Sequence, residues 1–172
     1  MKKIIKDILE GKIFIYPTDT IYGLGCDAEY PEAVDKIKQI KFRDKAKPMS
    51  IIAPGFKWIK ENCIIEKDLK LKKYLPGPYT LILKKKDPNF LNHISPNEYL
   101  GIRIPKCKFS KYVEKAKTPF ITTSVNLAGE PFTKNTRDIP KKILKKVDIV
   151  IDEGELNGQP SKLIKDGKEL KR

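Results

Sequence analysis

Cations and small hydroxyl side chains are the residues of this chain whose spacing suggests chemistry. The segment KFRDKAKP, residues 41–48, places Lys41, Arg43 and Lys47 where a predicted helix gives way to a predicted strand. Arginine can bind two phosphate oxygens at once and lysine adds a point charge, so such a spread can surround a triphosphate. The helix dipole also attracts cations to the C-terminal end of any helix. Taken alone, the segment leaves phosphate binding and helix capping as equal alternatives.

Polar side chains also stand on two predicted strands. Thr122, Ser124 and Asn126 lie in and just after the strand FITTS; they suit recognition of a polar ligand, although the same residue types are common in turns. Arg103 lies between two isoleucines in GIRIP, and successive side chains of a strand point to opposite faces, so it is predicted to face away from both. It is therefore either exposed to solvent or directed at an anion in a cleft.

The segment PTDTIYGLGCDA follows the first predicted strand. Gly23 and Gly25 can let the backbone approach a ligand closely or adopt positive φ. The letters GLGCDA satisfy the loose pattern Gly-x-Gly-x-x-Ala of dinucleotide-binding folds, but that pattern needs its glycines directly after a strand and at the start of a helix. Residues 18–22 intervene here, and the next predicted helix begins only near Pro31. A dinucleotide fold is therefore disfavoured, and a tight turn is the plain alternative.

Histidine and cysteine are too scarce to support several other chemistries. His93 is the single histidine, so any Ser-His-Asp or Cys-His mechanism would have to use it in a polar stretch without a visible partner. Three cysteines, Cys26, Cys63 and Cys107, show no Cys-x-x-Cys spacing, so neither a zinc site nor a disulfide framework is predicted. The absence of a signal peptide and of an apolar run near roughly 20 residues predicts a cytoplasmic protein without membrane contact.

The order of predicted elements indicates one α/β domain over residues 1–172, around a twisted, mixed sheet with flanking helices. A chain of this length can bury a core without disulfide or metal cross-links. Strands are expected at 13–17, 49–53, 79–84, 100–105, 120–124, 148–152 and 161–165. Helices are expected in the N-terminal segment and at 31–40, 56–62, 66–74, 109–116 and 137–146. The order of the strands in the sheet cannot be read from the sequence.

The formal net charge of +14 at pH 7 is large for 172 residues. A positive field raises the local concentration of phosphate-bearing partners and speeds their encounter. ATP, tRNA and other RNA would all benefit, so the charge does not choose among them. A solvated lysine-rich surface, of the kind found in proteins from hot environments, explains much of the charge without any partner.

Six segments, taken in order, make the chain resemble the YrdC/TsaC family from about Ile13 to Arg172. They are PTDTIYGLG, the Lys-x-Arg pair of KFR with its later Lys-Pro, PGPYTLIL, the arginine strand GIRIP, TSVN followed by AGEP, and GQPSK. Each segment is a modest signal, but their consecutive order across one domain is specific. The chain resembles the short form of the family, which consists of the catalytic domain.

The resemblance implies a twisted α/β sheet with a basic concave cavity and a nucleotidyltransferase activity. L-Threonine, bicarbonate or CO2, and ATP would give threonylcarbamoyl-AMP and pyrophosphate, and a partner transferase would deliver the group to tRNA as threonylcarbamoyladenosine. Mg2+ would accompany ATP, held by phosphates and waters without a metal site on the protein. A basic site without catalytic histidine or cysteine suits this reaction, because the reaction needs positioning and neutralisation of charge more than a nucleophile.

The resemblance also assigns residues to sites, position by position. The expected catalytic residues are Lys41 and Arg43. The expected ATP-binding residues are Arg43, Lys47, Ser124, Asn126 and Arg172. The expected threonine-binding residues are Thr20, Arg103, Thr122 and Ser161, with Arg103 pairing with the substrate carboxylate.

The chain departs from the family pattern at several positions. Ile52 replaces a common histidine, and Phe132 replaces a common small residue, which puts one nucleotide contact in doubt. Thr123 stands where the family pattern Pro-Ser-x-Asn has its proline. Lys162, after Ser161, stands where the family pattern Ser-Thr has its threonine. These changes affect individual contacts and leave the reaction class as expected.

Two other functions are compatible with the sequence. A non-catalytic module could use a basic concave face to bind double-stranded RNA or tRNA, with steep salt dependence from counterion release. Aromatic platforms for single-stranded RNA are not evident, since aromatics make up only 9% of residues. A carbamoyl-adenylate-forming domain like that of hydrogenase maturation proteins is disfavoured, because there it accompanies zinc-finger and acylphosphatase parts that are missing here.

Overall fold

The computed structural model describes residues 1–42, 44 and 46–171, so Arg43, Lys45 and Arg172 lie outside the described residues. Its helices are α1 (Lys2–Leu9), α2 (Pro31–Ile40), α3 (Phe56–Asn62), α4 (Leu71–Tyr74), α5 (Lys108–Ala116) and α6 (Lys141–Leu144), with the 3-10 helix η1 (Thr136–Asp138). Its strands are β1 (Phe14–Tyr16), β2 (Gly23–Gly25), β3 (Ser50–Ile52), β4 (Cys63–Ile64), β5 (Tyr79–Lys85), β6 (Tyr99–Arg103), β7 (Phe120–Ser124), β8 (Ile149–Val150), β9 (Lys162–Lys165) and β10 (Lys168–Leu170).

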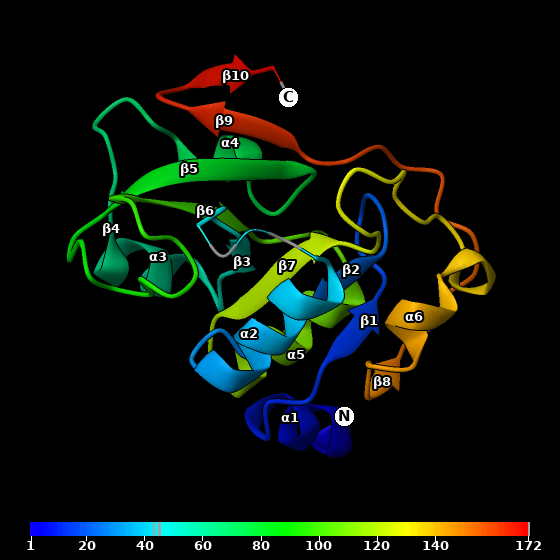
Figure 1. Ribbon diagram of the computed structural model, residues 1–172. Coiled ribbons are helices and arrows are strands. Elements are labelled where there is room, and N and C mark those ends of the chain that lie inside the picture. The colour runs from blue at the N-terminus through cyan, green and yellow to red at the C-terminus, as the bar shows by residue number, and fades with distance from the viewer. Residues whose placement is uncertain (43, 45, 172) are drawn as a thin grey trace.

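The strands form one mixed sheet with helices packed against it (Figure 1). Their order is β10-β9-β5-β6-β3-β7-β2-β1-β8, and β4 pairs with β5. The pairs β1–β8, β3–β6 and β5–β9 are parallel, and the other pairs are antiparallel. The predicted α/β class and mixed sheet are confirmed. None of the helices in the described ranges is long and apolar enough to cross a lipid bilayer.

Alternation along the central strands separates the main core from the face that carries the site. Ile51 of β3, Leu81 of β5, Ile102 of β6 and Ile121 of β7 are fully buried on one face. They belong to an apolar core that also contains residues of α2 and α3, such as Ile59. Since neighbouring residues of a strand point to opposite faces, the residue before or after each of these lies on the second face.

An aromatic cluster covers one end of the second face. Tyr16 of β1 stacks on Phe109 of α5 with ring centroids 4.0 Å apart, and Phe120 of β7 meets Phe109 edge-on at 5.1 Å. Ile8 of α1 is buried in the same cluster. Burial raises the pKa of Tyr16 far above its usual value, and its hydroxyl donates to the Ile121 carbonyl. Helices α1 and α5 therefore close one end of this face, and Figure 1 shows α2 on the opposite side of the sheet from α5.

The structure corrects three sequence-based expectations. Residues 23–25 form strand β2 with no positive φ at either glycine, where a turn or a ligand-binding loop was expected. The glycines are needed for close packing, since a Cβ on Gly23 would lie 2.7 Å from the Tyr16 ring. The helix expected at 66–74 shortens to α4, and the helix expected at 137–146 divides into η1 and α6 at Pro140, which lacks the N–H that an unbroken helix needs.

Replacing Gly25 with alanine is expected to destabilise the fold strongly. The new Cβ would lie 1.9 Å from the Ile121 carbonyl oxygen, so β2 and β7 would have to separate. We expect the free energy of unfolding to fall by at least about 3 kcal/mol, measured by urea denaturation. The matched control is Gly55→Ala, where a Cβ meets nothing within 4 Å and a change of at most about 1 kcal/mol is expected. Equal losses in the two variants would contradict this account of the packing.

Candidate functional site

A cavity of about 370 Å³ opens on the second face of the sheet, beside the aromatic cluster. Alternate residues of strands β5, β6 and β7 contribute to its lining: Thr80, Ile82, Gly101, Arg103, Thr122 and Ser124. Gly101 lets the Ser50 side chain pack closely against β6, because a Cβ there would lie 2.4 Å from the Ser50 hydroxyl oxygen. The lining therefore combines hydroxyl groups, apolar side chains and a guanidinium, which suits a small, polar, anionic ligand.

Arg103 is the cation that β6 directs into this cavity. Its Nη2 donates to Asp19 Oδ1 at 3.0 Å and to Thr20 Oγ1 at 3.2 Å. The Arg103 and Asp19 side chains are only 8% and 12% exposed, so their ion pair is poorly screened by solvent. Asp19 Oδ2 accepts the Lys106 backbone N–H at 2.8 Å, which ties the carboxylate to the chain just beyond β6.

The turn at residues 18–20 is organised around this ion pair. Thr18 Oγ1 accepts the Thr20 backbone N–H at 3.1 Å and donates to the Ile21 carbonyl at 2.7 Å. The two threonine hydroxyl oxygens lie 2.9 Å apart, and both side chains are buried. Thr20 thus presents its hydroxyl to Arg103, and it supports the guanidinium from behind the cavity.

An irregular segment at residues 152–161 closes another side of the cavity. Ser161 lines the cavity, and its hydroxyl lies 2.7 Å from that of Thr80 on β5. Gly158 passes so close to the turn that a Cβ would lie 2.1 Å from the Thr20 carbonyl oxygen. At its start, the segment is held by Tyr22, whose hydroxyl donates to the Gly154 carbonyl at 2.7 Å. The Gly154 N–H in turn donates to Asp152 and is the main cause of that residue's lowered pKa.

Lys41 lies behind the cavity wall and holds the end of β7. Its Nζ donates to the Ser124 carbonyl at 2.5 Å, to the Asn126 carbonyl at 2.9 Å and to Asn126 Oδ1 at 2.8 Å. The Ser124 hydroxyl also donates to Asn126 Oδ1 at 2.6 Å. With a residue exposure of 3%, Lys41 is buried, and its ammonium is satisfied by oxygens of the loop. Its contacts indicate that it shapes the wall that carries Ser124.

The structure brings most of the expected site residues together. The ones that line the cavity are Arg103, Thr122, Ser124 and Ser161. The ones that contact the lining residues from behind are Thr20, Lys41 and Asn126. Lys47 is exposed and directly precedes Pro48, which lines the cavity. Arg43 and Arg172 lie outside the described residues, so their expected contacts with ATP stay predictions.

Sequence reasoning missed several polar residues of the site, and Asp19 and Thr80 are two of them. Asp19, which holds Arg103, stands in the quoted segment PTDTIYGLG, where its acidic charge next to two threonines was a signal. Thr80 stands in PGPYTLIL, and its position next to the apolar Leu81 indicated a polar second face. The order of the strands in the sheet decides which segments these two residues face. That order could not be read from the sequence, so their place in the site was not predicted.

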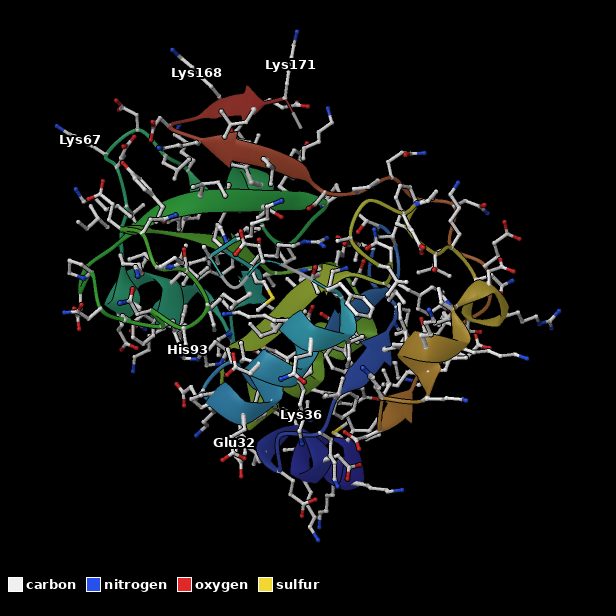
Figure 2. The ribbon with its side chains drawn as sticks, in the orientation of Figure 1. Glu32, Lys36, Lys67, His93, Lys168 and Lys171 are labelled. Carbon is white, nitrogen blue, oxygen red and sulfur yellow. The ribbon has the colours of Figure 1, made fainter. Side chains whose placement is uncertain are left out.

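The other residues that the sequence singled out lie elsewhere. Ile52, which stands where the resembled family commonly has a histidine, is fully buried in the aromatic cluster and supplies packing there. The carbonyl of Ala28 lies 2.8 Å from the Nε2 of His93, and His93 is not among the described residues that line the cavity. Figure 2 shows His93 near α2 and α3, so its ring supports that side of the fold.

The described residues offer no ready-made metal site. No group of three or more His, Cys, Asp or Glu side chains that could hold a metal ion is present among them. The described lining of the cavity also contains no carboxylate.

Known proteins with similar sequence and structure give the family context of this geometry. The profile of the Sua5/YciO/YrdC family, described as "Telomere recombination", matches residues 6–170. A Methanocaldococcus jannaschii protein, provisionally named a threonylcarbamoyl-AMP synthase, is 41% identical over 164 residues, which cover 93% of this chain and 77% of that protein. The threonylcarbamoyl-AMP synthase of Pseudoalteromonas atlantica is 30% identical over 167 residues, covering 91% of this chain and 87% of that protein.

A solved structure agrees over nearly the whole chain. Sua5 of Pyrococcus abyssi, crystallised in complex with L-threonine, superposes with a TM-score of 0.85 at 26% sequence identity. The match covers 97% of this chain and 51% of that one, so the present chain spans about half the length of that protein.

Proposed function

The chain belongs to the Sua5/YciO/YrdC family, and on this premise we propose that it is an L-threonylcarbamoyladenylate synthase. It would convert L-threonine, bicarbonate and ATP into threonylcarbamoyl-AMP and pyrophosphate. The names of the M. jannaschii and P. atlantica relatives support this reaction. The threonine complex of the P. abyssi protein supports the amino-acid substrate. The product would then serve a transferase that modifies tRNA with threonylcarbamoyladenosine.

The proposed reaction has two steps that need positioning more than a protein nucleophile. The threonine amine attacks the carbon of CO2 with loss of a proton, or the carbon of bicarbonate with loss of water, and either route leaves a carbamate. A carbamate oxygen then attacks the α-phosphorus of ATP, and the bond to the β-phosphate oxygen breaks to release pyrophosphate. Fixed orientation of the reactants and neutralisation of negative charge account for most of the acceleration that such steps need.

Arg103 is the residue we assign to the threonine carboxylate. A guanidinium can donate two parallel hydrogen bonds to a carboxylate, which fixes its direction as well as its place. Thr122 and Ser161 face the same cavity and supply hydroxyl groups for the rest of the amino acid. The volume of about 370 Å³ leaves room for more than an amino acid, so a reacting phosphate can enter the same space.

The wall at Ser124 is the part of the site we assign to the nucleotide. Ser124 lines the cavity, and Lys41 and Asn126 fix its position from behind. Lys47 and Arg43 would add positive charge from the loop that follows α2, and Arg172 would add it from the end of the chain. Mg2+ would enter bound to the phosphates of ATP and would reduce their charge at the moment of attack.

One observation carries the proposal most directly: an arginine held by a carboxylate that is only 12% exposed lines a cavity shared with Ser124 and Ser161. The test is pyrophosphate release by purified protein with threonine, bicarbonate, ATP and Mg2+, combined with mass spectrometry of the adenylate. We expect omission of threonine to abolish release and serine to support it poorly. Equal pyrophosphate release with and without threonine would rule out the proposed reaction.

RNA binding without catalysis is the second candidate, and one surface feature favours it. Lys67, Lys168 and Lys171 extend into solvent at one end of the molecule (Figure 2), within a chain of net charge +14. Such binding would fall steeply with salt concentration. RNA binding by a protein that makes no adenylate would favour this candidate, whereas threonine-dependent pyrophosphate release would make RNA contact at most an additional property.

A further inference from the structure

The feature that carries a new inference is the carboxylate of Asp19, which both anchors and neutralises Arg103. One carboxylate oxygen accepts a hydrogen bond from Arg103 Nη2 at 3.0 Å, and the other accepts one from the Lys106 backbone N–H at 2.8 Å. Arg103 and Lys106 belong to the same stretch of chain, so the carboxylate closes a ring that includes the guanidinium and the backbone beyond β6. Both Asp19 oxygens are thus used to fix a side chain of the cavity.

This arrangement has a geometric consequence for Arg103. With Thr20 Oγ1 at 3.2 Å as the second acceptor, Nη2 is directed toward the turn at residues 18–20. The plane of the guanidinium is therefore set by the protein before a ligand arrives. A preset donor group binds a carboxylate with a smaller loss of side-chain freedom than a mobile one.

It also has an electrostatic consequence. The pair of Arg103 and Asp19 carries no net charge, and its side chains are 8% and 12% exposed. A ligand that binds by charge alone, such as a phosphate dianion, gains little from a neutral pair. A carboxylate that enters the cavity lined by Arg103 gains directional hydrogen bonds from the guanidinium, and these do not depend on the net charge of the pair.

We propose that Asp19 is a positioning and specificity-determining residue, which makes Arg103 select the singly charged carboxylate of an amino acid over phosphate. This inference rests on the proposed function and deepens it. In a reaction that consumes a triphosphate and releases pyrophosphate, such selection keeps phosphates out of the amino-acid part of the cavity. Asp19 acts through Arg103 and need not touch the substrate.

The test compares Asp19→Asn with Asp27→Asn in the full-length chain. Asp27 is a buried aspartate, and its Oδ1 accepts hydrogen bonds from both the Thr118 hydroxyl at 2.7 Å and the Glu29 N–H at 2.9 Å, so asparagine can keep both bonds there. Calorimetric titration of threonine, with and without inorganic phosphate, gives the ratio of the two affinities. We expect Asp19→Asn to lower the threonine-to-phosphate affinity ratio at least about tenfold, and Asp27→Asn to leave it within about twofold.

A double-variant cycle shows whether Asp19 acts through Arg103. In the Arg103→Met background, we expect Asp19→Asn not to lower threonine affinity further, because the group that it positions is gone and only an unpaired negative charge is removed. If Asp19→Asn does not fold, Asp19→Glu replaces it: this variant keeps the charge and is expected to keep the discrimination against phosphate. Loss of that discrimination in a folded Asp19→Glu protein would overturn the inference.

The remaining outcomes separate this inference from the proposed function. If the wild-type protein binds threonine and Asp19→Asn behaves like Asp27→Asn in both titrations, the role of Asp19 is wrong and the proposed function stands. If the wild-type protein neither binds threonine nor forms the adenylate, the proposed function and this inference fall together.

Discussion

Replacing Arg103 with methionine is expected to lower kcat/KM for threonine by at least about 100-fold, while the KM for ATP stays within about twofold. Methionine keeps much of the arginine stem but removes the donors that would hold the substrate carboxylate. It also leaves Asp19 without the cation 3.0 Å away, so a negative charge would then face an anionic substrate. Steady-state pyrophosphate release with each substrate varied in turn measures both effects.

Arg137→Met is the matched control for this prediction. The same substitution is made at Arg137 of η1, which is exposed and is not among the described residues that line the cavity. We expect its kinetics to equal those of the wild-type protein. A folded Arg103→Met protein whose threonine kinetics lie within about threefold of those of Arg137→Met would contradict the assignment of Arg103 to the carboxylate.

The second large effect is expected for Lys41→Met. Lys41 Nζ donates to the Ser124 and Asn126 carbonyls and shares Asn126 Oδ1 with the Ser124 hydroxyl, so methionine would leave two partly buried carbonyls without this donor. Each buried polar group left unsatisfied costs about 1–3 kcal/mol. We therefore expect a loss of at least about 2 kcal/mol in the free energy of unfolding, together with a strong loss of ATP turnover as the Ser124 wall moves. Urea denaturation and pyrophosphate release measure the two effects separately.

Lys36→Met provides the control on α2, the helix that ends directly before Lys41. Lys36 lies on the exposed side of α2 (Figure 2), five positions before Lys41 in the sequence. A change within about 0.5 kcal/mol and unchanged turnover are expected there. If Lys41→Met matched Lys36→Met in stability and lost only turnover, Lys41 would act directly on the nucleotide, and its role in holding the loop would be wrong.

The parts of the site that could be predicted are those that depend on local alternation. Arg103 between two isoleucines was predicted to face away from them, and it does: Ile102 is in the core, whereas Arg103 lines the cavity. Thr122 and Ser124 follow the same rule on β7. Period-two alternation is a property of any strand, so it can be read before the neighbours of the strand are known.

The parts that could not be predicted depend on contacts between distant segments. Lys41 reads in the sequence as a cation at the end of a helix, free to bind phosphate. In the structure its ammonium lies against the loop at residues 124–126, more than eighty positions away, which only the packing of α2 against the sheet determines. Gly23 and Gly25 likewise read as a flexible turn, because the Tyr16 ring and the Ile121 carbonyl that require them are remote in the sequence.

The most direct test of the central claim, that one cavity joins an amino-acid carbamate to a nucleotide, is mass spectrometry after incubation with 13C-labelled bicarbonate, threonine, ATP and Mg2+. We predict a threonylcarbamoyl-AMP peak shifted by the mass of a single 13C atom, present only when threonine and ATP are both supplied and missing with Arg103→Met. Consumption of ATP without this labelled adduct, or a labelled adduct that forms equally well with Arg103→Met, would contradict the account.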